Sequence, residues 1–292
     1  MLKKSFLSLC LLSLSSWAMA QSYVVYDFTH DKVLESRSSM SVQPIASVTK
    51  LMTAVVFLEH NKKRDCTTSI TEEDTDYIKH TRTKLPKYTP IACSELLKAM
   101  FVHSDNYAAH ALARSAGISR QSFIQKMNEK ARALGMRSTR FHDSSGLSSN
   151  NVSNVMDLVK LAKYALSIPE ISQLSNTRAA YIRAGRKNIF MQNTNKLVRE
   201  EMFDAALSKT GYIRESGYNL VFINKHRCNN ATIGVISLNN ASSAYRSNFT
   251  KNKLEDYGCF ALNDLPINDE NDRDIEAYDE DGLDRLIQRV GG

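Results

Sequence analysis

Strand-like segments lie near both ends of the chain, and helix-like segments lie between them. The strand-like segments are rich in β-branched and aromatic side chains and are separated by turn-forming residues. They cover residues 23–28 and 32–35 and, later in the chain, residues 203–209, 218–224 and 231–238. A strand buries its apolar face only by joining a sheet that packs against another layer. We therefore predict an α/β fold of the α+β type, in which both chain ends build one antiparallel sheet and a helical lobe is inserted between them.

The helical lobe is predicted from apolar residues that recur every three or four positions. A helix opens near Ser47, and Pro169 ends the last helix of the lobe. The other predicted helices cover residues 95–102, 105–114, 119–134, 154–166 and, after the last strand, 242–258. The polar side chains suited to cap these helices belong to Ser94, Ser104 or Asp105, Ser119 and Ser153. Two short extended pieces, residues 67–70 and 89–93, can pair across a polar, lysine-rich stretch.

The first twenty residues have the three-part pattern of a secretory signal peptide. Lys3 and Lys4 precede an apolar run over residues 6–14, and Ala18-Met19-Ala20 places small side chains where a signal peptidase cleaves. The run is shorter than the ~20 apolar residues of a membrane span, and its cysteine lacks the preceding small residue of a lipoprotein signal. We therefore expect residues 1–20 to be removed and the protein to be periplasmic.

Four cysteines remain after such cleavage: Cys66, Cys93, Cys228 and Cys259. An even number of cysteines in an exported chain predicts two disulfides, and four cysteines allow three pairings. We favour Cys66 with Cys93 and Cys228 with Cys259, because each pair belongs to one segment of the predicted fold. No Cys-x-x-Cys or matching histidine spacing indicates a zinc site, and we expect neither a metal nor any other cofactor.

Charge divides the mature chain into two parts. The formal net charge of the whole chain is +7 at pH 7, yet residues 263–292 contain ten acidic and only three basic side chains. We predict a basic folded body over residues 21–262, followed by an acidic, disordered tail that lacks apolar periodicity over residues 263–281. A basic exported body suggests an anionic partner such as the cell wall or a membrane surface. Because no nucleic-acid-binding motif accompanies the charge, we expect no nucleic-acid partner.

Three short motifs occur in a fixed order: Ser-x-x-Lys at 47–50, Ser-Asp-Asn at 104–106 and Lys-Thr-Gly at 209–211. Each motif alone is weak, since a helix cap, a second cap and a strand end with a turn are the more common explanations of such isolated matches. Their predicted contexts add weight. The first motif starts a helix, the second lies between two helices, and the third ends a strand that a hairpin follows. This ordered set is typical of serine β-lactamases and penicillin-binding proteins.

Further segments extend the resemblance. Five segments resemble D-alanyl-D-alanine peptidases of the low-molecular-mass penicillin-binding class, and most closely the D-alanyl-D-alanine endopeptidases of the penicillin-binding protein 7/8 type. These segments are residues 104–109, 127–131, 134–141, 146–148 and 193–197. The resemblance covers about residues 22–258. It implies a β-lactamase/transpeptidase-like fold, peptidoglycan as substrate and β-lactams as inhibitors. The chain after Lys209 is too short for both the second domain and the anchor of the larger carboxypeptidases, so we expect at most loose membrane association.

The residue types of the first two motifs suggest a nucleophile with its base. Ser47 and Lys50 are nearly one helical turn apart, so both side chains project to the same side. Burial of Lys50, with a second cation at Lys209, would lower the pKa of Lys50 and allow it to accept the Ser47 proton. Ser104 would relay the proton to the departing amine, and Asn106 would orient Lys50 and bind the substrate backbone.

The third motif suits a substrate carboxylate. Lys209 offers a charge and Thr210 a hydroxyl donor, while Gly211 lets the substrate approach the sheet edge. The resemblance implies that the backbone N–H groups of Ser47 and Tyr212 form the oxyanion hole. Asp105 is expected to face away from the site, as a helix cap or a surface charge.

Several functions fit these motifs. A DD-carboxypeptidase releases terminal D-Ala and a DD-endopeptidase cuts a cross-link, and local chemistry does not separate them; the resemblance favours the endopeptidase. A class A β-lactamase shares the motifs but has a Glu-x-x-Leu-Asn loop, whose nearest counterpart here, residues 170–174, has the wrong spacing and no asparagine. We therefore predict slow deacylation of bound penicillin. A non-enzymatic protein of the same fold would retain the motifs without activity.

Overall fold

A computed structural model describes residues 20–61, 66–225, 228 and 231–259. Except for Ala20, the predicted signal peptide and the acidic tail lie outside these residues. The central sheet has the strand order β2-β1-β11-β10-β9. Its strands are β1 (Ser22–Asp27), β2 (Lys32–Arg37), β9 (Ala205–Ile213), β10 (Gly217–Asn224) and β11 (Ile233–Asn240).

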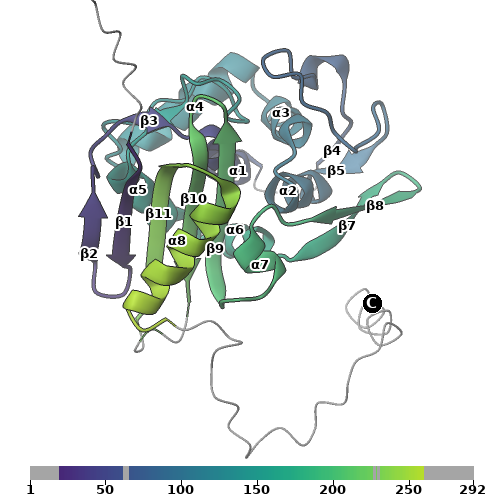
Figure 1. The fold of residues 1–292 in the computed structure, drawn as a ribbon. Coiled ribbons are helices and arrows are strands. Elements are labelled where there is room, and N and C mark those ends of the chain that lie inside the picture. The colour runs from purple at the N-terminus through teal and green to yellow at the C-terminus, as the bar shows by residue number, and fades with distance from the viewer. Residues whose placement is uncertain (1–19, 62–65, 226–227, 229–230, 260–292) are drawn as a thin grey trace, which may run out of the picture. The chain divides into compact units, whose positions relative to one another are not determined.

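All neighbouring strands in this sheet are antiparallel. The first strand, β1, pairs along its whole length with the last, β11, so that Ser22 lies opposite Leu238 and Asp27 opposite Ile233. This pairing joins the N-terminal hairpin to the C-terminal strands (Figure 1). It confirms the predicted sheet built from both chain ends.

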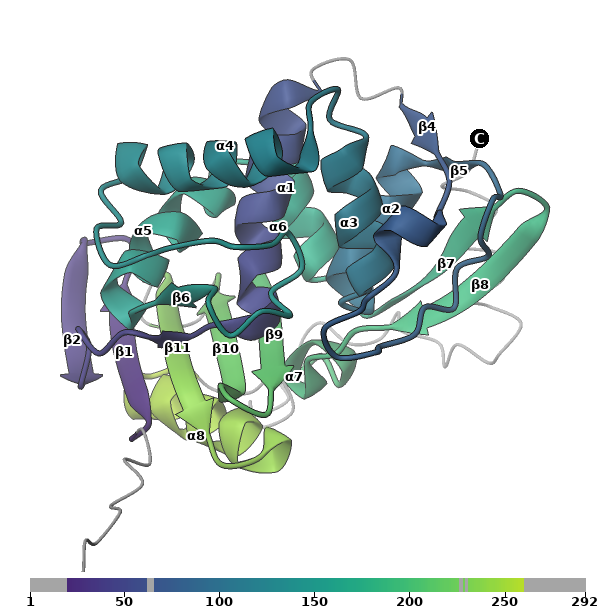
Figure 2. The same ribbon diagram turned by 90° about the horizontal axis from the view of Figure 1, so that it is seen from above.

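Helices cover both faces of the sheet. The helical lobe lies on one face, and α8 (Ser243–Asp256) lies on the other, where it contacts β10 and β11 (Figure 2). The helices before α8 are α1 (Lys50–His60), α2 (Cys93–Val102), α3 (Asn106–Arg114), α4 (Arg120–Ala133), α5 (Val155–Leu166), α6 (Pro169–Ser175) and α7 (Lys196–Arg199).

The two helical layers divide the core along the sheet. Successive strand residues point to opposite faces, so Val24 packs with the helical lobe whereas Val25 packs with the α8 side. The same alternation places Val221 against the lobe and Phe222 beneath α8. The sheet is therefore buried on both faces, which holds β9, the edge strand that carries the third motif, in a fixed position.

Helix starts follow the predicted caps in part. Ser119 caps α4 by accepting a hydrogen bond from the backbone N–H of Ser122, as predicted. Asp105 caps α3 and Asn154 caps α5, one residue after the predicted Ser153. The predicted cap at Ser94 is wrong, because α2 begins at Cys93, two residues before the predicted start, and has no side-chain cap.

Short strand pairs tie the loops of the lobe together. One pair joins β3 (Gln43–Pro44) to β6 (Val152–Ser153), and another joins β4 (Thr67–Thr68) to β5 (Ile91–Ala92). The second pair brings Cys66 and Cys93 together as a disulfide, and Cys228 is bonded to Cys259. The favoured pairing of the four cysteines is thus confirmed.

Three features of the fold differ from the sequence prediction. Pro169 does not only end a helix; it is the first residue of α6, where proline's missing N–H costs no hydrogen bond. A hairpin of β7 (Ala179–Ala184) and β8 (Lys187–Gln192) was not predicted. The Lys-Thr-Gly motif lies inside β9 rather than at its end, because β9 continues through Tyr212 and Ile213.

Candidate active site

The structure brings the predicted catalytic residues together from three separate regions of the chain. Ser47 lies in a short 3-10 helix, η1 (Ala46–Thr49), that runs directly into α1. The Lys50 amine lies 2.8 Å from the Ser47 hydroxyl and 2.6 Å from the Asn106 side-chain oxygen. The Lys209 amine, on β9, lies 2.8 Å from the hydroxyl of Ser104, in the connection between α2 and α3. The predicted convergence of these five residues is therefore observed.

The turn that carries Ser47 is clamped between two glycines. A Cβ atom on Gly146 would lie 1.9 Å from the backbone oxygen of Ala46, and one on Gly211 would lie 2.7 Å from that of Ile45. Ala46 has a φ of +47°, in the left-handed region that non-glycine residues rarely occupy. Close backbone contact from both sides thus holds Ala46, the residue before Ser47, in a conformation that local sequence alone does not favour.

Replacing Gly146 by alanine is expected to lower the free energy of unfolding by roughly 2–3 kcal/mol and to slow acylation of Ser47. The added methyl group clashes with backbone rather than with a movable side chain, and Gly146 has a φ of +87°. Urea unfolding checks the stability. Gly117→Ala is the matched control, since Gly117 also has positive φ (+76°) but open space at its Cβ position. Equal losses in both variants would show that the clamp has no effect.

Lys50 is fully buried, and its amine has a third polar neighbour, the backbone oxygen of Ser145 at 2.6 Å. Burial lowers the pKa of Lys50 to about 7, against the opposing attraction of the carboxylates of Asp143, Asp105 and Asp76. About half of the Lys50 amines are then neutral near pH 7. A neutral amine at this distance from Ser47 has the properties of a general base.

Lys209 is also buried, and it donates hydrogen bonds to Ser104 and to the backbone oxygen of Thr210. Burial lowers the pKa of Lys209 well below its usual range, and the positive charges of Lys50 and Arg246 lower it further. Burial, one of the two predicted causes, is thus confirmed as the main cause of the lowered pKa of Lys50, and the mutual repulsion of the two cations contributes to the lowered pKa of Lys209.

The two other residues of the Ser-Asp-Asn motif are fixed by neighbouring threonines. Asn106 donates from its amide nitrogen to the Thr81 hydroxyl at 3.0 Å, which leaves its oxygen directed at Lys50. Asp105 accepts hydrogen bonds from the Ala108 backbone and from the Thr83 hydroxyl. Asp105 is thus a helix cap, as predicted, but it is buried and is not a surface charge. Burial raises the pKa of its carboxyl.

The predicted loop over residues 142–151 supplies the Ser145 oxygen to Lys50. Asp143 organises this loop by accepting hydrogen bonds from the backbone N–H groups of Ser145, Gly146 and Ser148. Burial alone would raise the pKa of Asp143, but these hydrogen bonds outweigh burial and keep the carboxylate charged. Sequence reasoning identified the loop by composition and missed the role of Asp143.

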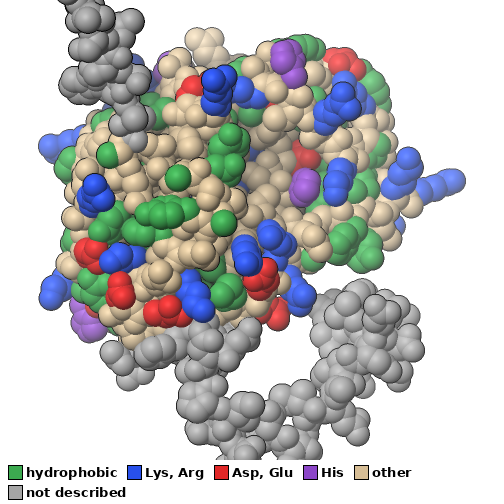
Figure 3. All heavy atoms as spheres, viewed as in Figure 1, with side chains coloured by type: hydrophobic (Ala, Val, Ile, Leu, Met, Phe, Trp, Pro, Cys, Tyr) green, Lys and Arg blue, Asp and Glu red, His purple; other side chains and the backbone are tan. Residues whose placement is uncertain are grey.

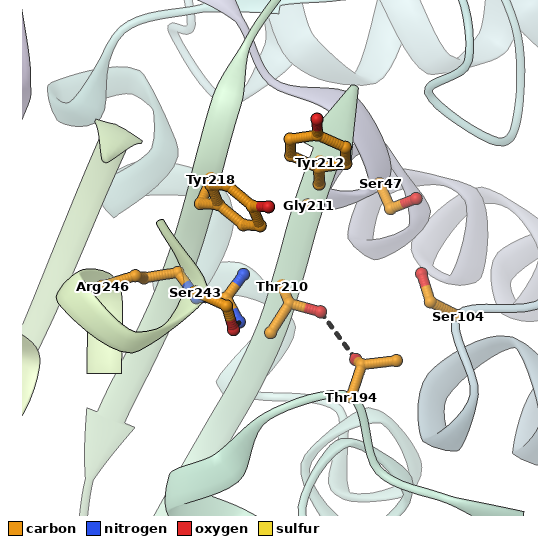
Figure 4. Close-up of a pocket in the computed structure, with 9 residues that line it drawn as sticks. All are labelled: Ser47, Ser104, Thr194, Thr210, Gly211, Tyr212, Tyr218, Ser243 and Arg246. Atoms are coloured by element: carbon orange, nitrogen blue, oxygen red, sulfur yellow. Dashed lines mark hydrogen bonds between the residues drawn. The ribbon is translucent and has the colours of Figure 1, made fainter. Parts of the chain in front are cut away.

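A pocket of about 280 Å³ opens beside Ser47 (Figure 4). Five of the residues that line it were predicted to take part: Ser47, Ser104, Thr210, Gly211 and Tyr212. Four were not: Thr194, Tyr218, Ser243 and Arg246. On the face of the molecule shown in Figure 3, the surface is hollowed between the strand side and the helical lobe.

Arg246 is the one charged side chain among the four unpredicted residues that line the pocket. It lies on α8, is 4% exposed, and donates hydrogen bonds to the Asn219 backbone oxygen and the Ser243 hydroxyl. Burial lowers its pKa to about 10, so it stays charged at neutral pH. Its Nε atom is buried without a hydrogen-bond partner. No motif surrounds Arg246 in the sequence, and only the folding of α8 over the sheet places it at the pocket.

Among the described residues, no cluster of three or more histidine, cysteine, aspartate or glutamate side chains is arranged to hold a metal ion. Within the same residues, no helix is both long enough and apolar enough to span a membrane.

Comparisons with known proteins identify similar D-alanyl-D-alanine peptidases. The chain is 68% identical over 286 residues to a D-alanyl-D-alanine endopeptidase of Haemophilus influenzae, covering 97% of each protein. A D-alanyl-D-alanine endopeptidase of Pseudomonas aeruginosa is 35% identical over 202 residues, which is 68% of this chain and 65% of the relative.

Solved structures show the same fold. A variant of a Streptomyces DD-transpeptidase matches with a TM-score of 0.75 and 25% identity, over 81% of this chain and 96% of the other. Penicillin-binding protein D2 of Listeria monocytogenes, in its ampicillin-bound form, matches with a TM-score of 0.67, 26% identity and the same coverage. Residues 15–241, more than half of the chain, match the family described as D-alanyl-D-alanine carboxypeptidase. The protein therefore belongs to the D-alanyl-D-alanine carboxypeptidase family of serine peptidases.

Proposed function

We propose that the protein is a serine DD-peptidase that hydrolyses D-Ala-containing cross-links of peptidoglycan, through an acyl-enzyme on Ser47, and that penicillins inhibit it. The observation that carries this proposal is the Lys50 amine, which is buried with a pKa of about 7 and lies 2.8 Å from the Ser47 hydroxyl. Such a pair activates a hydroxyl nucleophile without a histidine or a metal.

The acylation step uses the residues of the first two motifs. Lys50 accepts the proton of Ser47 while the Ser47 oxygen bonds to the carbonyl carbon of a D-Ala residue. The carbon–nitrogen bond then breaks, and the proton passes from Lys50 by way of the Ser104 hydroxyl to the leaving nitrogen. Water later attacks the ester carbon, and Ser47 recovers its proton. Asn106 holds Lys50 in place, through the 2.6 Å contact between them.

Substrate binding uses the third motif and its neighbours. Three side chains suit the carboxylate of the leaving group: those of Lys209, Thr210 and the newly identified Arg246. Arg246 is positively charged, Lys209 becomes so when it is protonated, and the Thr210 hydroxyl donates a hydrogen bond. A Cβ on Gly211 would lie 3.1 Å from the Ser47 backbone nitrogen, so β9 passes directly beside the nucleophile. The backbone N–H groups of Ser47 and Tyr212 form the oxyanion hole in this proposal.

The β-lactamase alternative has less support. Glu170, the nearest counterpart of a deacylating glutamate, lies on α6 and is not among the residues that line the pocket. No other carboxylate of the described residues lines the pocket either. Penicillin bound to Ser47 should accordingly be released slowly.

Product analysis separates the endopeptidase from the carboxypeptidase. The name of the Haemophilus influenzae relative supports the endopeptidase. Purified mature protein is expected to convert cross-linked dimeric muropeptides to monomers, with little D-Ala released from monomeric pentapeptide, as read by mass spectrometry. Release of D-Ala without loss of dimers would establish the carboxypeptidase instead. Rapid turnover of a penicillin would favour the β-lactamase.

We also propose that the protein acts in the periplasm, with residues 1–20 removed, residues 21–262 as the peptidase domain and residues 263–292 as an acidic tail. The disulfides Cys66–Cys93 and Cys228–Cys259 support an oxidising compartment. Its partners are peptidoglycan and β-lactams, with no nucleic acid and at most loose membrane association.

A further inference from the structure

A second hollow adjoins the pocket beside Ser47. It has a volume of about 380 Å³ and is lined in part by Lys84, His103, Phe190, Gln192, Thr194 and Arg199. Thr194 lines both hollows, and His103 directly precedes Ser104 in the chain. Basic side chains and a histidine lie along the margin of the depression in Figure 3. The two hollows therefore adjoin at Thr194, and we call them together the groove; the proposed chemistry uses only the first of them.

The hairpin of β7 and β8 forms the outer part of this groove. Tyr181 and Phe190 lie opposite each other in the hairpin, and their ring centroids are 5.3 Å apart. They are 57% and 45% exposed, although large aromatic side chains are usually buried. The opposite face of the hairpin packs on α2 through buried side chains such as Ile182 and Met191. The aromatic pair is thus presented to solvent by a hairpin that packs on α2. Figure 1 shows this hairpin extending beyond α2 at the edge of the molecule.

The second hollow is suited to an anionic ligand. Lys84 and Arg199 line it, and no carboxylate of the described part of the chain does. Arg199 is anchored by a hydrogen bond to the Asn193 backbone oxygen. Lys84 is exposed and forms no ion pair with another described residue. A positive hollow beside exposed aromatic rings fits a peptide that carries carboxylates along its length.

The place of the groove relative to Ser47 identifies which part of a substrate it would meet. Thr194 lies 2.6 Å from Thr210, hydroxyl to hydroxyl. In Figure 4 these two threonines lie in the lower half of the view with Ser104, whereas Tyr212 lies in the upper half with Ser47. In the proposed function, Thr210 holds the carboxylate of the leaving group and Ser104 protonates its nitrogen. The second hollow therefore continues from the leaving-group side of the scissile bond.

We propose that the second hollow and the Tyr181–Phe190 pair bind the acceptor stem peptide of a cross-link, which is the anionic peptide of the second strand that departs as the leaving group. This inference rests on the proposed function. A free D-Ala leaving group ends at the pocket, whereas the acceptor stem continues past Thr194. The groove therefore selects cross-linked over monomeric substrate, a distinction that the residues around Ser47 do not make.

The test compares three substrates in Lys84→Gln, in Phe190→Ala and in the double variant that combines both changes. For a cross-linked dimeric muropeptide, the double variant is expected to raise KM and lower kcat/KM by about tenfold or more, as loss of one charged and one aromatic contact implies. Acylation by a penicillin and release of D-Ala from monomeric pentapeptide, neither of which involves an acceptor stem, are expected to change less than about twofold. Lys32→Gln and Met40→Ala, at exposed positions near the opposite edge of the sheet, are matched controls.

The outcomes separate this inference from the proposed function. If wild type neither binds penicillin covalently nor cuts dimers, the proposed function fails and the groove has no such role. If wild type does both, but the variants lose activity equally on all three substrates or retain it on the dimer, the inference fails alone. Penicillin acylation also reports folding of each variant. If Phe190→Ala alone is poorly folded, Lys84→Gln, an exposed substitution, decides the matter.

Discussion

Ser47→Ala is expected to abolish covalent labelling by a fluorescent penicillin and to lower hydrolysis of cross-linked muropeptides by at least about 10⁴-fold. No acyl-enzyme forms without the Ser47 oxygen, and removing the nucleophile of a serine peptidase leaves only the contribution of binding and the oxyanion hole. The change deletes one partly exposed hydroxyl, so stability should stay within about 0.5–1 kcal/mol of wild type. Gel fluorescence after brief exposure to the penicillin, with mass spectrometry of the muropeptides, measures both losses.

Ser36→Ala is the matched control, because Ser36 is an exposed serine on β2 at the opposite edge of the sheet. It should label as wild type does. Labelling that persists in Ser47→Ala would assign the nucleophile to another residue and would overturn the acyl-enzyme on Ser47. Absence of labelling in wild type, with a folded protein, would instead favour the non-enzymatic alternative.

The sheet could be predicted from sequence because its signals are local. Apolar, β-branched segments that turn residues bound, such as residues 218–224, form strands. The strand segments from the two chain ends can bury their apolar faces only by pairing in one sheet. The disulfide Cys66–Cys93 followed from the pairing of two short extended pieces. The predicted site residues came from motif order, which reports chemistry without reporting geometry.

The features that were missed depend on tertiary contacts. The exposed face of the β7–β8 hairpin carries Tyr181, Arg183 and Phe190. Because two of these exposed residues are aromatic, the sequence lacks the alternation of apolar and polar residues that marks a half-buried strand. The short helix α6 was hidden because a proline between two helices reads as an ending as easily as a beginning. Arg246 reaches the pocket only because α8 folds over the sheet.

Two causes of the lowered Lys50 pKa were predicted, burial and a nearby cation, and only the structure shows that burial is the larger one. A sequence shows that a second cation, Lys209, belongs to the same family motif set, but it does not show how deeply Lys50 is buried. In the structure, Lys50 is fully enclosed between α1, the start of α3 and the loop held by Asp143. Burial is consequently the main cause, and any change that admits water to this amine should raise its pKa.

Lys50→Gln is expected to lower the rate of acylation by about 10³-fold, within the range of roughly 10² to 10⁴ that general bases contribute. Glutamine keeps a polar group near Ser47 and Asn106, but it cannot accept the Ser47 proton. Lys160→Gln, at a partly exposed lysine on α5, is the matched control and should acylate as wild type does.

The pH profile distinguishes loss of the base from a merely structural loss. In wild type, the acylation rate should rise with pH through about 7, because only the unprotonated Lys50 amine accepts a proton and its pKa is about 7. At pH 6 the neutral fraction is about a tenth, so the rate should be about a tenth of its plateau at pH 9. Lys50→Gln should retain a low rate without this rise.

The rate of fluorescent penicillin labelling from pH 5 to 9 measures both profiles. A rise of the same size in Lys50→Gln would assign the titration to another group, and a flat wild-type profile would mean that Lys50 stays neutral, or stays charged, across the whole range.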